Sequence, residues 1–288
     1  MTLRLSKLHA TGNDFLVQLA LDSDAPRLDA VAVAALCDRH RGIGADGVIT
    51  VTPAGAGADC TMTLRNADGG MAEMSGNGIR CLAWVAARAG LGSGSALVVD
   101  TPAGRRVVNL ERDDRGSVVA ADVDMGPITF DPANIPIDAE SAFDVEVSVG
   151  GERYRGDAAG MGNPHLVLLV DDPASVPVGV AGPAIEHDPR FPRRVNVEFV
   201  AVTGADRVTM RVWERGAGET QSCGTGACAA AAVARRRALV GDRVLVDVLG
   251  GSLTVHLGAT VRLGGPVVHV FDVEVSHRDL MDALARTP

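Results

Sequence analysis

The chain has 288 residues, 47% of them hydrophobic, and a formal net charge of −9 at pH 7. That length suffices for one large domain or for two of ordinary size. The acidic balance argues against nucleic acid as the main partner. No apolar run approaches the roughly 18 residues that span a bilayer, so a membrane is not an expected partner either.

The N-terminal segment lacks the apolar core of a signal peptide, so we expect a cytoplasmic protein with reduced thiols. The five cysteines form no CxxC pair, which argues against a disulfide framework and a structural zinc site. Cys37, in an apolar run, is expected to be a small buried hydrophobe. The histidines form no HxH or HExxH motif, so we predict no metal site.

Short strand-like runs and two helices are predicted along the chain. The runs are broken by Gly, Asp and Pro, and they include residues 47–51, 97–101, 207–213, 243–249 and 267–275. Helices that are small and apolar on most sides, as buried helices are, are predicted at Ile79–Arg88 and Ala227–Leu239. The basic cluster at 235–237 suits a helix C-terminus. Strands wrapped around one helix in each half would satisfy this pattern.

The two halves of the chain repeat one another. GNDFLV, which begins at Gly12, recurs as GNPHLV 150 positions later, and RGIGADGV loosely matches RRVNVEFV. SGNG at Ser75 recurs as CGTG at Cys223, 148 positions later. Matches in the same order at nearly constant spacing indicate a duplicated unit of about 150 residues. We expect one domain at 1–118 with about 268–288, and another at 119–267, linked near 112–118.

A Gly-rich turn before a helix is suited to anions and to reactive thiols. The first N–H groups of a helix lack partners inside it, and the helix dipole adds positive potential there. A thiol at that position is expected to have its pKa lowered, which marks Cys223 as a candidate reactive cysteine. The alternative is that CGTGACA only packs tightly against a sheet. The repeat and the polar segment before Cys223 favour a functional site.

Two such turns on opposite faces of a bound molecule would allow inversion of a stereocentre. One group would remove a proton from carbon, the other would return it on the opposite face, and helix N–H groups would stabilise the charge that develops on a carboxylate. The sole lysine, Lys7, lies in an N-terminal strand-like run rather than in a context that suggests pyridoxal phosphate. We therefore predict a route that uses no cofactor.

At this point the sequence resembles the diaminopimelate epimerase family of cofactor-independent isomerases. The resemblance runs the length of the chain and rests on HATGNDFLV, GIGADG, RNADGGMAEMSGNGIRC, GNPHLV, RVNVEF and ERGAGETQSCGTGACA. It implies an α/β (α+β) fold of two pseudosymmetric domains, each a barrel-like β-sheet around a central helix. It also implies lysine biosynthesis, a small amino-acid substrate, no cofactor, and a possible homodimer. The family uses one catalytic cysteine in each domain.

The resemblance assigns a site residue by residue. The implied catalytic residues are Cys223, Ser75 at the position of the second cysteine, His165 and Glu214. The implied substrate-binding residues are Asn13, Asn66, Gly76, Asn77, Asn163, Asn196, Arg215, Gly224 and Thr225. Arg215 would receive a distal carboxylate through its forked donors. Taken alone, His165 could equally be structural, and the asparagines could equally be turn residues.

Two positions depart from the family pattern. Gly47 stands where many relatives carry a glutamine, and Ser75 replaces a thiol, whose pKa is about 8.5, by a hydroxyl closer to the ~15.7 of water. The serine could be an introduced lesion, a native residue that relays a proton through water or Glu73, or a sign of a related one-base reaction. Cys81 falls in the helix body and is interpreted as packing.

Three functions remain open from the sequence. The first is epimerisation of LL-diaminopimelate to the meso form, without pyridoxal phosphate, by two-base proton transfer in which Ser75 impairs or modifies turnover. The second is a related racemase, epimerase or dehydratase that acts on another amino acid. The third is an amino-acid-binding protein that turns over slowly.

Overall fold

The computed structural model describes residues 2–22, 24–72, 74–276 and 278. The chain divides into two compact units, Met1–Val123 with Gly265–Pro288, and Asp124–Gly264. The segment expected to link the halves, 112–118, instead forms the turn between two antiparallel strands of the N-terminal unit. The chain crosses between the units a few residues later, inside a strand.

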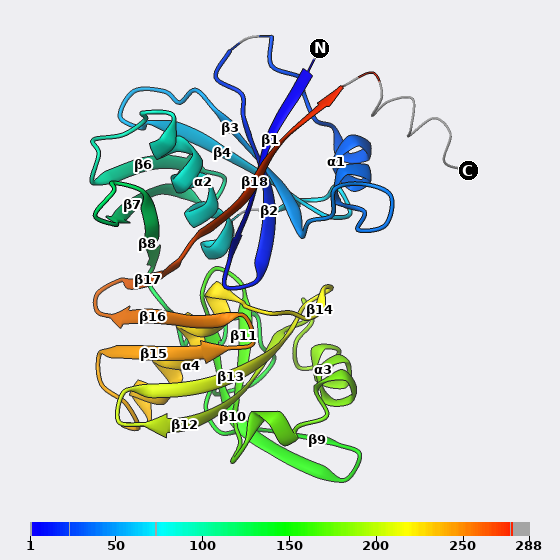
Figure 1. Ribbon diagram of the computed structural model, residues 1–288. Coiled ribbons are helices and arrows are strands. Elements are labelled where there is room, and N and C mark those ends of the chain that lie inside the picture. The colour runs from blue at the N-terminus through cyan, green and yellow to red at the C-terminus, as the bar shows by residue number, and fades with distance from the viewer. Residues whose placement is uncertain (1, 23, 73, 277, 279–288) are drawn as a thin grey trace. The chain divides into compact units, whose positions relative to one another are not determined.

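Strands predominate in both units, which confirms the predicted mixed α/β class (Figure 1). The elements of the N-terminal unit are β1 (Thr2–Ala10), β2 (Asn13–Leu19), α1 (Ala30–Cys37), β3 (Gly47–Thr52), β4 (Cys60–Asn66), β5 (Met71–Ala72), α2 (Gly76–Arg88), β6 (Ala96–Thr101), β7 (Gly104–Arg112), most of β8 (Val118–Gly126) and β18 (Val268–Ser276). Those of the C-terminal unit are β9 (Val145–Val149), β10 (Glu152–Gly160), β11 (Pro164–Leu169), the 3₁₀ turn η1 (Pro173–Ser175), α3 (Val178–Glu186), β12 (Asn196–Gly204), β13 (Arg207–Glu214), β14 (Gly218–Glu219), α4 (Gly224–Arg236), β15 (Arg243–Val248), β16 (Gly251–Leu257) and most of β17 (Val261–Pro266).

Each unit wraps its strands around one helix. Helix α2 contacts β1, β2, β3, β4 and β7, and α4 contacts β10 to β13, β15 and β16. The side chains of α2 include Ile79 and Leu82, both fully buried, whereas α4 is almost entirely alanine along its buried length. Small side chains let strands pack close to a helix on most of its sides, because interiors are filled to near-crystal density. The prediction of two buried helices is confirmed.

The strand pairing of the two units is the same. Strand β2 pairs in parallel with β3, and β11 pairs in parallel with β12; β4 and β6 match β13 and β15 in the same way. Even the register agrees, because Phe15 lies opposite Gly47 and His165 lies opposite Asn196. The duplication predicted from sequence offsets of about 150 residues is therefore a duplication of topology.

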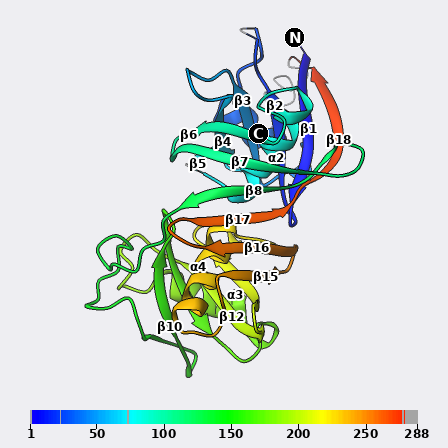
Figure 2. The same cartoon turned by 90° about the vertical axis from the view of Figure 1, so that its left-hand side faces the viewer.

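The last described strand completes the first unit. Strand β18 pairs antiparallel with β1 from Thr2↔Ser276 to His9↔Val268, and the two strands run side by side in Figure 2. Val273 and Val275 pack against a core that contains Leu3, Leu5 and other residues of the N-terminal segment. The expected return of the final strand to the first half is thus observed.

Both central helices begin three residues earlier than predicted, and α4 ends earlier. Ser75 and Cys223 cap α2 and α4: Ser75 Oγ accepts from Gly78 N at 3.0 Å, and Cys223 Sγ accepts from Gly226 N at 3.4 Å. The glycines therefore form the first helical turn rather than a loop before it, because a capping acceptor satisfies an otherwise unpaired N–H. At the other end, Ala238 has φ +58°, which stops α4 before the predicted Leu239.

No helix among the described residues is long and apolar enough to cross a membrane.

Candidate active site

Cys223 occupies the start of α4 in the C-terminal unit and is 4% exposed. Its sulfur accepts the Gly226 N–H and lies 3.5 Å from Thr225 Oγ1. Gly226 N and Ala227 N are bonded to Cys223, so only Gly224 and Thr225 keep first-turn N–H groups without a partner inside the helix. A nucleophilic atom thus lies beside two N–H groups suited to a carboxylate.

Glu214, at the end of β13, lies near the Cys223 thiol. Its carboxylate accepts from Thr220 Oγ1 at 2.5 Å, and its charge acts on the nearby Cys223 thiol. Burial raises the pKa of Glu214 above its ordinary value, and hydrogen bonds from Thr220 and Cys223 oppose that rise. The pair therefore places a proton acceptor near a thiol.

The expectation that the helix start lowers the pKa of Cys223 is wrong for this structure. The pKa of Cys223 is raised well above its ordinary value, first by burial and then by the charges of Glu214 and Glu198. The hydrogen bonds from Thr225 and Gly226 lower it by less. Desolvation of a thiolate together with two nearby carboxylates thus outweighs the helix N-terminus, and the burial of this position cannot be read from the local sequence.

His165 lies fully buried on β11 beside the same helix start. Its Nδ1 is 2.6 Å from Glu198 Oε1, and its Nε2 is 2.9 Å from Asn163 Oδ1. Asn163 Nδ2 in turn donates to Thr225 Oγ1 at 3.4 Å. Hydrogen bonds therefore join a buried carboxylate to the side chain that neighbours the Cys223 sulfur.

Ser75 occupies the equivalent position in the N-terminal unit, at the start of α2, and is partly buried. Asn77 lies two residues further along α2. Its Nδ2 donates to Asn13 Oδ1 at 3.3 Å, and its Oδ1 accepts from the fully buried Arg80 at 2.7 Å. Asn13 Nδ2 donates to Asp46 Oδ2 at 2.6 Å. The structure thus brings three predicted residues of this unit together and adds Arg80 and Asp46, which hold their amides.

The two helix starts have different surroundings. Phe15 and Ile49 occupy the strand positions that His165 and Glu198 occupy in the C-terminal unit. A Cβ built on Gly78 would meet Ile49 Cδ1, whereas one built on Gly226 would meet Glu198 Oε1. Glu198 was missed as a site residue, although a charged residue inside the apolar run VEFV was a visible signal.

The other predicted residues lie at or next to strand ends, each within its own unit. Asn196 is buried, donates to Pro164 O at 2.9 Å and accepts from Arg215 N at 2.9 Å, so backbone groups hold its amide. The exposed Arg215 donates from its side chain to Arg193 O. Asn66 is exposed at the end of β4. Glu73, the suggested relay for Ser75, lies outside the described residues.

Gly47 fits its position closely. A Cβ at this residue would lie 2.6 Å from Arg65 O, so a glutamine in its place would require the neighbouring strand to shift. The packing of β3 against β4 therefore favours glycine at this position.

The remaining cysteines examined from the sequence are buried, as expected. Cys81 is fully buried in the body of α2, and burial raises its pKa to about 12. Cys37 is 3% exposed, and burial raises its pKa to about 11.

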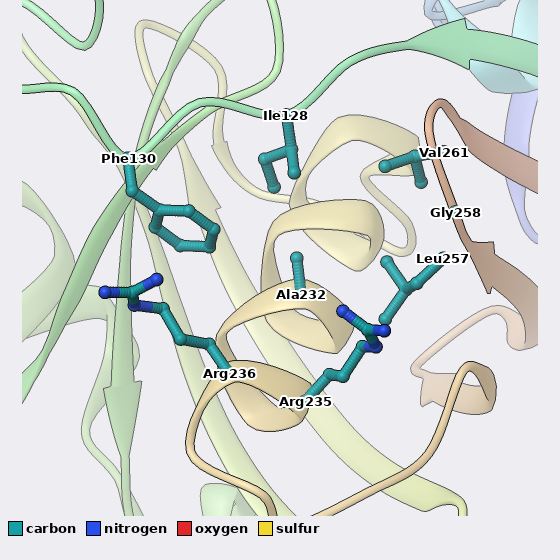
Figure 3. Close-up of a pocket in the computed structure, with 8 residues that line it drawn as sticks. All are labelled: Ile128, Phe130, Ala232, Arg235, Arg236, Leu257, Gly258 and Val261. Atoms are coloured by element: carbon teal, nitrogen blue, oxygen red, sulfur yellow. The ribbon is translucent and has the colours of Figure 1, made fainter.

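A pocket of about 350 Å³ lies at the far end of α4, away from the Cys223 start of that helix. Figure 3 shows Arg236 near Phe130 and Arg235 near Leu257, with Ile128 at the other end of the pocket. Arg235 pairs with Asp242, and Arg236 lies over the ring of Phe143. Among the described residues, no group of three or more His, Cys, Asp or Glu side chains could hold a metal ion.

Replacing Gly226 by alanine should destabilise the C-terminal unit by about 2 kcal/mol, because overpacking a filled interior costs about 1–3 kcal/mol. The new methyl group would lie 2.6 Å from the carboxylate oxygen of Glu198, which His165 holds in place. The matched change is Gly78→Ala, whose nearest neighbour would be the flexible end of Ile49 at 3.1 Å rather than a fixed carboxylate. Urea denaturation of both variants measures the difference; equal stabilities would contradict it.

The family match and the curated relatives, together with solved structures of the same fold, identify the chain as an amino-acid epimerase. A hydroxyproline epimerase from Agrobacterium vitis, solved with bound trans-4-hydroxy-L-proline, shares the fold with a TM-score of 0.69 at 19% identity, covering 98% of this chain and 94% of that one. A predicted epimerase from Pseudomonas aeruginosa gives a TM-score of 0.68, also at 19% identity, with 95% and 99% covered.

The sequence pattern of the diaminopimelate epimerase family matches residues 5–130 and 158–268. The chain is 42% identical over 280 residues to the diaminopimelate epimerase of Pseudomonas entomophila, covering 96% of this chain and 99% of that protein. It is also 42% identical over 295 residues to that of Halorhodospira halophila, covering 99% and 98%. The chain belongs to the diaminopimelate epimerase family.

Proposed function

We propose that this chain converts LL-diaminopimelate to the meso form by proton transfer at the α-carbon, without pyridoxal phosphate. The observation that carries the proposal is the position of the Cys223 sulfur at the start of a helix, beside the Gly224 and Thr225 N–H groups that have no partner inside that helix, with the Glu214 carboxylate nearby. Transfer of the thiol proton to Glu214 leaves a sulfur that removes the α-proton from one face of the substrate. The names of the relatives supply the substrate.

The helix starts stabilise the charge that the reaction creates. Loss of the α-proton moves charge onto the oxygens of the substrate carboxylate, and preoriented N–H donors bind that charge more strongly than the ground state. We assign this role to the backbone groups of Gly76, Asn77, Gly224 and Thr225. Arg215 binds the distal carboxylate, and the remaining polar contacts come from Asn13, Asn66, Asn163 and Asn196, with His165 assisting Cys223.

Ser75 serves the opposite face of the α-carbon poorly. A neutral hydroxyl, with a pKa near ~15.7 in water, is a far weaker base than a thiolate. Ser75 also accepts the Gly78 N–H, as Cys223 accepts that of Gly226, so the serine keeps the geometry of the position while changing its acidity. Turnover that depends on both faces is therefore slowed.

The difference in basicity between Ser75 and Cys223 predicts that the α-hydrogen exchanges with solvent faster than the configuration of the α-carbon inverts. In D₂O, with no cofactor added, one of the two stereoisomers should take up α-deuterium at least about tenfold faster than the isomers interconvert, because only the face served by Cys223 has a competent base. Proton NMR follows the exchange and chiral chromatography follows the isomers. Absence of exchange with any diamino acid would reject the proposal, and release of a keto acid would indicate a dehydratase instead.

We further propose that the protein acts in lysine biosynthesis in the cytoplasm and forms a homodimer. Family membership supports the first two, and the resemblance to a family that is often dimeric supports the third. Light scattering on the purified chain tests the dimer, since a monomer at micromolar concentration would reject it.

A further inference from the structure

We propose that Glu198 is a positioning residue that keeps both ring nitrogens of His165 protonated. A buried cation then lies close to Cys223 and Glu214 in the C-terminal unit. The inference deepens the proposed function and rests on it for its catalytic meaning. Its structural content concerns only the C-terminal unit.

The hydrogen bonds of His165 require two donors. Nδ1 faces the carboxylate oxygen of Glu198 at 2.6 Å, and Nε2 faces the carbonyl oxygen of Asn163 at 2.9 Å. In this orientation Asn163 Nδ2 donates to Thr225 Oγ1 at 3.4 Å. Both partners of the ring are therefore acceptors, and an imidazole satisfies two acceptors only when it carries two hydrogens.

His165 and Glu198 are buried, so a negative charge on Glu198 needs a positive partner. His165 and Glu198 are both fully buried, and Glu198 Oε2 has no hydrogen-bond partner among the described residues. A buried carboxylate is tolerated when a cation pairs with it, and leaving it unpaired is costly. A second proton on His165 supplies that cation.

The fold does not require this pair. In the N-terminal unit the same two strand positions, in the same register, hold Phe15 and Ile49. An apolar pair therefore fills this space beneath a helix start equally well. The charged pair is confined to the unit whose helix begins with a cysteine.

The positive charge of His165 acts on the ionisation of Glu214. The titratable groups around His165 are Glu198 on β12, Glu214 on β13 and the Cys223 thiol on α4. The charge of His165 lowers the pKa of Glu214 against the effect of burial, which favours the ionised carboxylate that can accept the thiol proton. Glu198 acts on the reaction through this histidine and touches no substrate atom in the proposed mechanism.

The test counts protons on His165 by NMR of the full chain labelled with ¹⁵N-histidine. In the present chain both ring nitrogens should carry a hydrogen at neutral pH. In Glu198→Gln, which removes the negative charge at nearly constant volume, His165 should release one proton near the ordinary histidine value of about 6.5. His165→Phe assigns the resonance.

A kinetic measurement separates this role from simple packing. In Glu198→Gln, α-proton exchange should fall at least about tenfold as pH rises through that same midpoint, and the present chain should show no such break. Asp157→Asn removes another buried carboxylate of this unit, one bonded to Arg237, and should leave the His165 titration unchanged. If Glu198→Gln does not fold, the pair His165→Phe with Glu198→Ile copies the N-terminal unit and should fold but exchange at least about tenfold more slowly, without the break.

Two results would overturn the proposal. One is a singly protonated His165 in the present chain at neutral pH. The other is the same His165 titration in the present chain and in Glu198→Gln. Neither measurement needs a substrate, so a failure here is distinct from the absence of α-proton exchange, which would reject the proposed function instead.

Discussion

Replacing Cys223 by alanine should lower the rate of α-proton exchange at least about 10³-fold, because general acid–base groups contribute about 10²–10⁴-fold and Cys223 is the only competent one proposed. Glu214 would remain, but Thr220 holds its carboxylate. In the proposed mechanism Glu214 accepts the proton of the Cys223 thiol and does not itself remove the α-proton. Deuterium exchange of diaminopimelate, followed by NMR, measures the loss.

The control for this change is Cys228→Ala on the same helix. Cys228 lies fully buried in the body of α4, five residues after the catalytic position, so its loss should leave the exchange rate within about twofold. Thermal denaturation of both variants checks that they fold, since Cys223 also caps the helix and loss of a cap costs about 1 kcal/mol. A Cys223→Ala chain that keeps its exchange rate would remove the sulfur from the mechanism.

Replacing Ser75 by cysteine should raise the rate of epimerisation at least about 10²-fold. The substitution exchanges a hydroxyl with a pKa near ~15.7 for a thiol near ~8.5, and so adds a second group that can carry a proton. The fold accepts the change, because Cys223 already caps α4 through the same kind of bond that Ser75 makes to Gly78. Initial rates from LL-diaminopimelate, separated by chiral chromatography, measure the gain.

The pH dependence gives the second readout of that variant. Two coupled titrations should govern the rate in Ser75→Cys where one governs it in the present chain. Ser75→Ala serves as the control: it removes the cap of α2, which costs about 1 kcal/mol, and adds no proton carrier, so the rate should not rise. An unchanged rate in Ser75→Cys would mean that this site does not serve two-base epimerisation.

The sequence predicted the topology better than it predicted the electrostatics. The offsets between GNDFLV and GNPHLV and between SGNG and CGTG pointed to the repeat, because duplicated topology preserves spacing. The position of Cys223 at a helix start was also correct. The direction of its pKa shift was not, since that depends on burial and on Glu198, a residue of another strand. Contacts between strands distant in sequence carry no local signal.

The helix boundaries were missed for a more local reason. Glycine is a poor helix former in a helix interior, so the Gly-x-Gly segments appeared to precede the helices. Their first-turn placement follows from the side-chain caps of Ser75 and Cys223 and from close packing: a Cβ on Gly78 or Gly226 would press on Ile49 or Glu198. Neither the cap nor the packing is visible without the neighbouring strands.

The pairing of β1 with β18 has a consequence for biosynthesis. Residues of Asp124–Gly264 emerge from the ribosome as one uninterrupted block, whereas the unit that starts the chain cannot close its sheet until Val268–Ser276 has been translated. Domains generally fold as units during synthesis. The unit Asp124–Gly264 should therefore fold first. Until β18 is synthesised, β1 is an exposed edge strand, and exposed edge strands are prone to aggregation.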